Sequence, residues 1–255
     1  MIYALIGAAL IGVSLGLLGS GGSILTIPLL VYLAGEPPKL AIVEGLAIVG
    51  LIAGAGAVPY AHQRSVDARS VLLFGVPGMA GAFAGSTLAR HVPGAVQLTM
   101  FAIVMLGAAF AMMRRRPDPA PDAAPHPALL VALPGLGVGL LTGLVGVGGG
   151  FLIVPALVVL LGLPMRRAIG TSLVVIALNC AAGFAKSLHV ATDAGLALDY
   201  QLVATFAALG VAGTLVGNNL AQRAPAQSLR QGFAVFLLLM GVFILWQEVP
   251  EVLAR

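Results

Sequence analysis

Charged and reactive side chains are scarce in this chain of 255 residues. Lys, Arg, Asp and Glu make up 9% of it, whereas 60% of its residues are hydrophobic and the mean hydropathy is +1.07. A soluble domain carries about 25% charged residues, so this composition excludes a soluble fold and predicts an integral membrane protein. Cys180 is the one cysteine, which excludes a disulfide framework and a Cys-rich metal site.

Catalytic and metal-binding patterns are missing as well. The chain has no HExxH motif and no pair of acidic residues in neighbouring apolar runs, as an intramembrane aspartyl protease would need. We therefore predict that the protein is not an enzyme and uses no cofactor and no metal. The net charge of +4 comes from basic residues scattered in short segments between apolar runs. Membrane topology explains this distribution better than nucleic-acid binding does.

Eight long stretches lack Asp, Glu, Lys, Arg and His, and six of them are 17 to 23 residues long, enough for one membrane-spanning helix each. The first and fifth are 35 and 39 residues long, and each has a glycine cluster near its middle. We predict an all-α transmembrane bundle of about eight spans, with re-entrant or half-length helices in these two segments. The stretches are 1–35, 45–61, 70–89, 92–113, 127–165, 168–185, 200–222 and 231–247.

The chain contains an internal repeat. Residues 16–35 (GLLGSGGSILTIPLLVYLAG) align with residues 143–162 (GLVGVGGGFLIVPALVVLLG) at an offset of 127, with 11 of 20 positions identical. An offset of 132 then pairs Asp67 with Asp199 and the GxxxG pair Gly81 and Gly85 with Gly213 and Gly217, which we expect at helix contacts. We predict a first transmembrane repeat over 1–113, a proline-rich linker over 114–127 and a second repeat over 128–255.

The basic residues predict how the two repeats are oriented. If every stretch crosses the membrane once, six of the 13 Lys and Arg lie on one side of the membrane and seven on the other. If the first and fifth segments instead enter the membrane and return, nine of the basic residues lie on one side and four on the other. This uneven distribution agrees with the accumulation of Lys and Arg in cytoplasmic loops. This second arrangement predicts inverted repeats, a cytoplasmic linker and both termini outside. Such repeats are frequent in secondary transporters.

The glycine clusters are the first candidates for a binding site. A glycine-rich break in a membrane helix exposes backbone N–H groups, which suit anions, and irregular backbone at membrane depth is tolerated only beside protein or a water-filled cavity. The alternative is close helix packing. The candidate substrate-binding residues here are Gly19, Ser20, Gly21, Gly22, Gly146, Gly148, Gly149 and Gly150.

Polar residues near these clusters are further candidates for substrate binding. Thr171, Ser172 and Asn179 either bind substrate oxygens or join helices by hydrogen bonds. Lys186 either holds an anion inside the membrane or extends to the membrane edge.

Three titratable residues are candidates for coupling or gating. Glu44 lies about one turn into its span, where it either couples transport to protons or caps the helix. His62 and His189 occupy equivalent positions in the two repeats and either titrate during transport or lie at the membrane surface.

The glycine motifs, each followed by Pro28 or Pro155, and the AIGTSL element at 168–173 resemble the TauE/SafE family of sulfite exporters. The resemblance covers essentially the whole chain. The first repeat departs from the family pattern at AIVEGL (41–46), where the second repeat has AIGTSL. It also has Ser20 and Ser23 where the second repeat has Val147 and Gly150.

This resemblance implies a multi-pass protein of the inner membrane that exports sulfite, organosulfonates or related small anions, with the lipid bilayer as its surroundings. We expect a carrier that works by alternating access, with proton coupling if it imports its substrate. An anion channel and a non-transporting membrane scaffold are the alternatives.

Overall fold

The computed structural model describes residues 2–20, 22–89, 94–114, 127–145, 150–193 and 198–253, and these residues form helices and short connections without any strand. The predicted all-helical fold is confirmed. The helices of the first half are α1 (Ile2–Leu18), α2 (Ser23–Pro28), η1 (Leu29–Ala34), α3 (Pro38–His62), α4 (Ala68–Ser70), η2 (Val71–Gly75), α5 (Val76–Ala89) and α6 (Gly94–Met113). Those of the second half are α7 (Ala128–Val145), α8 (Gly150–Pro155), η3 (Ala156–Leu160), α9 (Met165–Asp193), α10 (Tyr200–Arg223) and α11 (Ala226–Leu253).

Five of these helical segments are long and apolar enough to cross a membrane, which supports a multi-pass membrane protein. The predicted total of about eight spans stays a prediction, because the other apolar helices in the described residues are 10 to 17 residues long. The five segments are Leu40–His62, Ala68–Gly85, Met165–Ala185, Tyr200–Arg223 and Ala226–Trp246.

The first double-length stretch does not form one continuous helix. Helix α1 ends at Leu18, where Gly19 adopts a φ of +79°, a left-handed conformation that ends many helices and favours glycine. The chain then returns along α1, since a Cβ atom on Gly7 would collide with Leu29 Cδ1. Two short helical segments therefore lie side by side where the sequence has one long apolar run.

Each half contains the same irregularity after a proline. Pro28 is followed by the π-helical turn η1 and Pro155 by the π-helical turn η3. Proline has no N–H for the normal helical hydrogen bond, and a wider turn accommodates this loss. Both turns are followed by glycines with positive φ, Gly35 at +82° and Gly162 at +67°.

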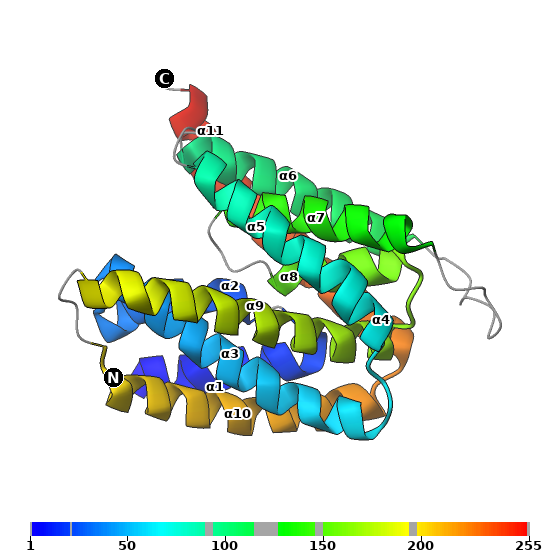
Figure 1. Ribbon diagram of the computed structural model, residues 1–255, viewed down its shortest axis with the longest axis horizontal. Helices are drawn as coiled ribbons and strands as arrows, with labels where there is room; N and C mark the ends of the chain where they lie inside the picture. The colour runs from blue at the N-terminus through cyan, green and yellow to red at the C-terminus, as the bar shows by residue number, and fades with distance from the viewer. Residues whose placement is uncertain are drawn as a thin grey trace.

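Helices from the two halves pack against each other in matching pairs. Helix α3 lies against α9, α1 against α10, and α5 against α7, while α6 packs on α11 (Figure 1). Glycines allow the close approach, because a Cβ atom on Gly213 or Gly217 would collide with carbonyl oxygens of α1, and one on Gly81 with Leu136 O of α7. The predicted helix contacts at these three glycines are confirmed.

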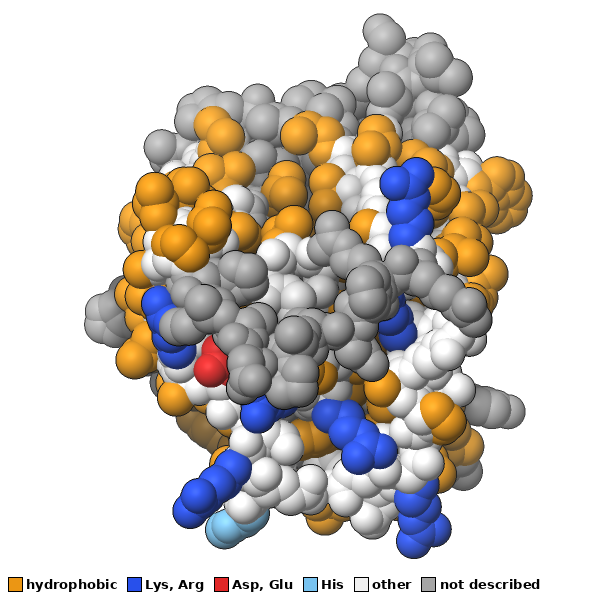
Figure 2. Space-filling view, turned by 90° about the vertical axis from the view of Figure 1, so that its right-hand side faces the viewer, with side chains coloured by type: hydrophobic (Ala, Val, Ile, Leu, Met, Phe, Trp, Pro, Cys, Tyr) orange, Lys and Arg blue, Asp and Glu red, His pale blue; other side chains and the backbone are white. Residues whose placement is uncertain are grey.

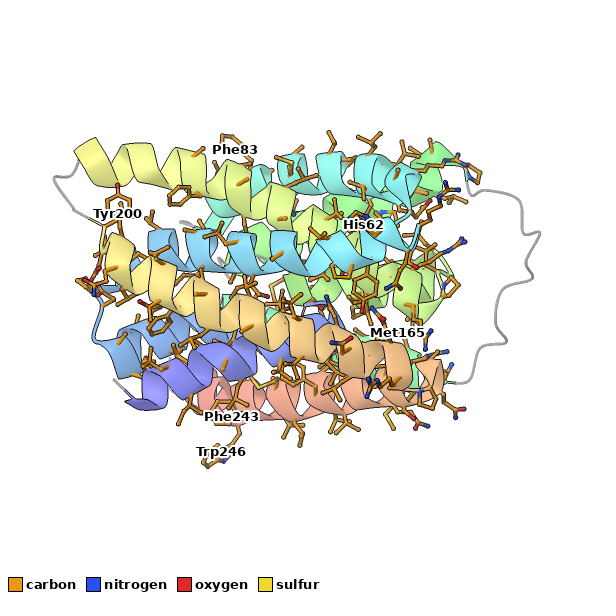
Figure 3. All side chains as sticks on the ribbon, turned by 90° about the horizontal axis from the view of Figure 1, so that it is seen from below. His62, Phe83, Met165, Tyr200, Phe243 and Trp246 are labelled. Atoms are coloured by element: carbon orange, nitrogen blue, oxygen red, sulfur yellow. The ribbon has the colours of Figure 1, made fainter. Side chains whose placement is uncertain are left out.

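The two ends of the helix bundle carry different side chains. All seven Lys and Arg whose side chains the structure describes lie near the end at which α3 and α6 finish and α9 and α11 begin, seen face-on in Figure 2. We call this the basic end. Tyr200, 71% exposed, lies near the opposite end (Figure 3). Aromatic residues such as Tyr are enriched at membrane surfaces.

Large apolar side chains also cover the outside of the bundle between its ends. Phe83, Phe243 and Trp246 are each more than half exposed and point outward (Figure 3). Exposed apolar surface on this scale is unfavourable in water but suits contact with lipid.

Candidate functional site

The first glycine break packs against the middle of the bundle through Ser172 of α9. Ser172 is fully buried, and its Oγ lies 3.0 Å from Gly19 O and 2.8 Å from Ile169 O, the two carbonyls to which it donates. A Cβ atom on Gly19 would lie 2.9 Å from both Ile169 Cα and Ser172 Oγ. The break therefore fits against α9 only because residue 19 is glycine.

Three further hydroxyl groups surround this break, and one of them has no partner. Ser23 Oγ donates to Ser20 O at 3.0 Å, and Thr26 Oγ1 donates to Gly22 O at 3.3 Å. Ser20 is fully buried, but its Oγ has no hydrogen-bond partner among the described residues. Buried polar atoms in native proteins are usually satisfied, so this hydroxyl remains a candidate for binding a ligand.

Gly150, the last glycine of the second cluster, lies beside the first break inside the molecule. A Cβ atom on Gly150, the first residue of α8, would lie 3.0 Å from Ser23 Oγ and 2.9 Å from Ile176 Cδ1. Gly150 of the second cluster and Ser23 beside the first, more than 120 residues apart in the chain, are thus adjacent. Four predicted site glycines lie outside the described residues: Gly21, Gly146, Gly148 and Gly149.

The remaining candidates on α9 lie at different distances from these breaks. Asn179 is seven residues beyond Ser172, which places it on the same face of the helix, and its buried Oδ1 has no hydrogen-bond partner in the described part of the chain. Lys186 is 14 residues beyond Ser172, about 21 Å along a continuous helix at 1.5 Å per residue. His189 lies further still, so the fold separates both from the first break.

Thr171 and Glu44 join the two halves at opposite ends of the bundle. Thr171 Oγ1 accepts a hydrogen bond from Asp67 N at 2.9 Å, and Glu44 Oε1 accepts one from Asp199 N at 3.0 Å. These are equivalent contacts, because offsets of 127 and 132 relate Glu44 to Thr171 and Asp67 to Asp199. Thr171 therefore has a structural partner away from the breaks.

The two aspartates of these contacts also start helices. Asp67 Oδ2 accepts from Ser70 N at 3.0 Å, and Asp199 Oδ1 accepts from Leu202 N at 2.9 Å, as N-capping carboxylates do. Glu44 is fully buried, and its second oxygen, Oε2, has no partner among the described residues. His62, the third coupling candidate, is exposed as the last residue of α3 at the basic end (Figure 3).

Sequence reasoning missed two polar residues on α10. Asn218 Nδ2 donates to Gly56 O of α3 at 2.9 Å, and a Cβ atom on Gly56 would lie 3.2 Å from Thr214 Oγ1. Thr214 Oγ1 and Asn218 Oδ1 are buried and have no partner among the described residues. The signal was available, because Thr214 and Asn218 stand four residues apart in an apolar run, and the first repeat has Ala82 at the position equivalent to Thr214.

The side chains at the breaks are therefore neutral hydrogen-bonding groups. Hydroxyl and amide groups can bind the oxygens of a small polar molecule in a buried site. Among the residues that the structure describes, no group of three or more His, Cys, Asp or Glu is arranged to hold a metal ion.

Comparison with known proteins identifies the family of this chain. The family model described as sulfite exporter TauE/SafE matches residues 4–244. The chain belongs to the TauE/SafE family. This membership makes it a membrane transporter.

Relatives of this TauE/SafE chain carry matching names. One from Xylella fastidiosa (strain 9a5c), named a probable membrane transporter protein, is 33% identical over 253 residues, covering 96% of this chain and 95% of the relative. The probable membrane transporter protein YdhB of Bacillus subtilis (strain 168) is 23% identical over 250 residues, covering 93% and 97%. No solved structure matches the chain significantly.

Proposed function

We propose that the protein is a secondary carrier of the inner membrane that exports sulfite, an organosulfonate or a related small sulfur-containing anion. The observation that carries this proposal is the meeting of the two glycine breaks, at which Gly150 lies beside Ser23. Broken helices inside a transporter mark its substrate site, because irregular backbone at membrane depth needs a protein-lined or water-lined cavity. The buried and unpartnered Ser20 hydroxyl supplies a hydrogen-bond donor there.

Alternating access would follow from two inverted repeats. Helix α1 runs toward the basic end and its equivalent α7 starts from that end, while the equivalent pairs α1–α10 and α7–α5 pack alike (Figure 1). Rocking of one repeat against the other would expose a central site to each side in turn. The basic end is the cytoplasmic end in this proposal, since Lys and Arg accumulate on that side.

Membrane voltage favours the outward direction. Moving one negative charge out of a negative-inside cell releases about 2.3 kcal/mol per 100 mV, so export of a monovalent anion needs no coupling ion. Import would need one. Glu44, His62 and His189 are the residues that would take part in such coupling.

Purified protein in proteoliposomes tests this function. We expect saturable sulfite flux that shows counterflow, the acceleration of labelled substrate entering against unlabelled substrate inside. Conductance at single-channel rates would instead establish an anion channel. Absence of both flux and binding across sulfite, organosulfonates and sulfate would favour a membrane scaffold.

Cysteine labelling tests the proposed topology separately. Single cysteines replace Asp118 in the linker and Arg255 at the carboxyl end, in a Cys180→Ala background that removes the one native cysteine. An impermeant thiol reagent should label the two positions from opposite faces of the membrane. Labelling of both from one face would rule out the inverted arrangement.

A further inference from the structure

A second set of buried polar groups lies beside the glycine break and has no assigned role. Thr214 and Asn218 are 0% and 2% exposed, lie one turn apart on α10, and face Gly56 of α3. The oxygen atoms Thr214 Oγ1 and Asn218 Oδ1 have no hydrogen-bond partner among the described residues. Two unsatisfied oxygens one turn apart are unusual for a native core, and they indicate a place where a ligand completes the hydrogen bonds.

The chemistry of Gly56 fixes how Asn218 is oriented. A backbone carbonyl only accepts hydrogen bonds, so the amide must turn its Nδ2 toward Gly56 O, at 2.9 Å. The free atom of Asn218 is therefore Oδ1, which only accepts. Thr214 Oγ1 can either donate or accept. A ligand that satisfies this pair must offer at least one hydrogen-bond donor, for Asn218 Oδ1, and Thr214 Oγ1 can then donate to an acceptor atom of the same ligand.

Helix α9 connects this pair to the first glycine break. Ser172 is hydrogen-bonded to Gly19 O, and the next residue, Leu173, has its Cδ1 3.5 Å from the Cβ position of Gly56. On the other side, a Cβ atom on Gly16 of α1 would lie 2.9 Å from Asn218 N. The Thr214–Asn218 pair therefore belongs to the same junction of α1, α3, α9 and α10 as the break.

The junction offers little charge to balance a strongly charged ligand. Arg166 of α9 is exposed, and its guanidinium donates to Gln222 O, one turn beyond Asn218, at 2.6 Å. Tyr60, one turn beyond Gly56, is buried, and its hydroxyl has no hydrogen-bond partner among the residues that the structure describes. Because the cost of moving an ion out of water grows with the square of its charge, a dianion costs about four times as much as a monoanion in such surroundings.

We propose that Thr214 and Asn218 select a singly charged oxyanion that still carries an acidic hydrogen, which is the chemistry of hydrogen sulfite. Thr214 donates to an anionic oxygen of the ligand, and Asn218 Oδ1 accepts its acidic hydrogen. This assignment rests on the proposed function, because it specifies the protonation state of the anion that the carrier moves. Dianions such as sulfate lack the donor and carry too much charge.

Flux in proteoliposomes at several pH values tests the assignment. At constant total sulfite, the flux should fall as pH rises through the second ionisation of sulfurous acid, in proportion to the singly protonated fraction. Methanesulfonate is the control, since it stays a monoanion without an acidic hydrogen and so reports any titration of the protein itself. We expect its flux to be weaker than that of hydrogen sulfite by about 10- to 100-fold and independent of pH.

Substitution of Asn218 then tests the residue. Asn218→Leu should lower hydrogen sulfite flux about 10- to 100-fold and methanesulfonate flux much less, so that the two fluxes become similar. Asn219→Leu is the matched control, because Asn219 is the exposed neighbour on the same helix and should behave as wild type. A monodisperse Asn218→Leu protein that still carries methanesulfonate is correctly folded.

The outcomes separate this inference from the proposed function. If the wild type carries no sulfur oxyanion at all, the proposed function fails. If it carries sulfate as well as sulfite, or if sulfite flux does not change with pH, the function stands and the selection by Thr214 and Asn218 is wrong. Sulfite flux that requires sodium, with a requirement that Asn218→Leu removes, would also overturn the inference by assigning these oxygens to a cation.

Discussion

The two glycine breaks have the same framework but different surroundings. The first break has hydroxyl groups at Ser20, Ser23 and Thr26, whereas the equivalent positions in the second repeat are Val147, Gly150 and Ile153. The neighbouring helices differ in the same way. Ser172 on α9 meets the first break, and its equivalent in the first repeat is Gly45 on α3.

The features shared by both repeats shape the backbone, whereas the features that differ between them are the polar side chains able to bind a substrate. Helix breaks, prolines and positive-φ glycines recur in both halves, because they shape the backbone. Among the described residues, hydroxyl-bearing side chains are more numerous around the first break than beside the second, where Thr142 of α7 is buried and donates to Gly139 O. Duplication therefore accounts for the fold of the site, and we expect binding to depend more on the first break than on the second.

Among the variants at the two breaks, Gly19→Ala should lower transport flux the most. Its methyl group would press on the backbone of Ile169, and a misplaced break should lower flux about 100-fold. Gly35→Ala is the matched control, because Gly35 also has a positive φ but has open space around its Cβ position. Proteoliposome flux of both variants measures the difference. Equal losses would show that backbone conformation alone, and not contact with α9, matters.

Ser20→Ala should lower flux about tenfold by removing the hydroxyl at the first break that has no partner among the described residues. Ser14→Ala on α1, the helix that precedes the break, is the control and should transport normally. The KM for sulfite should rise in Ser20→Ala if the hydroxyl contacts the substrate. Unchanged transport would place the substrate elsewhere.

Gly150→Ala should have a smaller effect than Gly19→Ala. Its methyl group would meet the side-chain ends of Ile176 and Ser23, which can move, so we expect flux to fall about three- to tenfold. Gly137→Ala, at a position with open space, should be neutral. If Gly150→Ala were the more damaging change, the second break would be the more important one.

Substitutions at the two equivalent hydrogen bonds, Asp67 N to Thr171 Oγ1 and Asp199 N to Glu44 Oε1, should have the smallest effect on flux. Thr171→Val removes the acceptor for Asp67 N and should lower the free energy of unfolding by about 1 to 2 kcal/mol. Glu44→Gln keeps an acceptor for Asp199 N and should cost less. Thermal unfolding in detergent compares them. A loss of flux in Glu44→Gln with unchanged stability would instead identify Glu44 as a coupling residue.

Much of this fold could be predicted from the sequence, because its signals are local. Apolar runs predict membrane helices, and a glycine cluster followed by proline predicts a break wherever it occurs. The hydrogen bond from Asn218 to Gly56 joins residues 162 positions apart, and that from Asp199 to Glu44 spans 155. No local pattern encodes such contacts. Thr214 and Asn218 stand out in the sequence as polar residues in an apolar run, but their contact with Gly56 could not be foreseen, and neither could the structural partner of Thr171.

Protection of Ser23 from chemical modification tests the central claim, that the meeting breaks form the anion site. Ser23→Cys is made in a Cys180→Ala background, with Thr87→Cys at an exposed position as the control. Methanesulfonate serves as the protecting anion because, unlike sulfite, it does not consume thiol reagents. The account predicts that methanesulfonate slows modification at position 23 in a saturable manner and has no effect at position 87. Equal modification rates at position 23 with and without an anion concentration that saturates flux would contradict it.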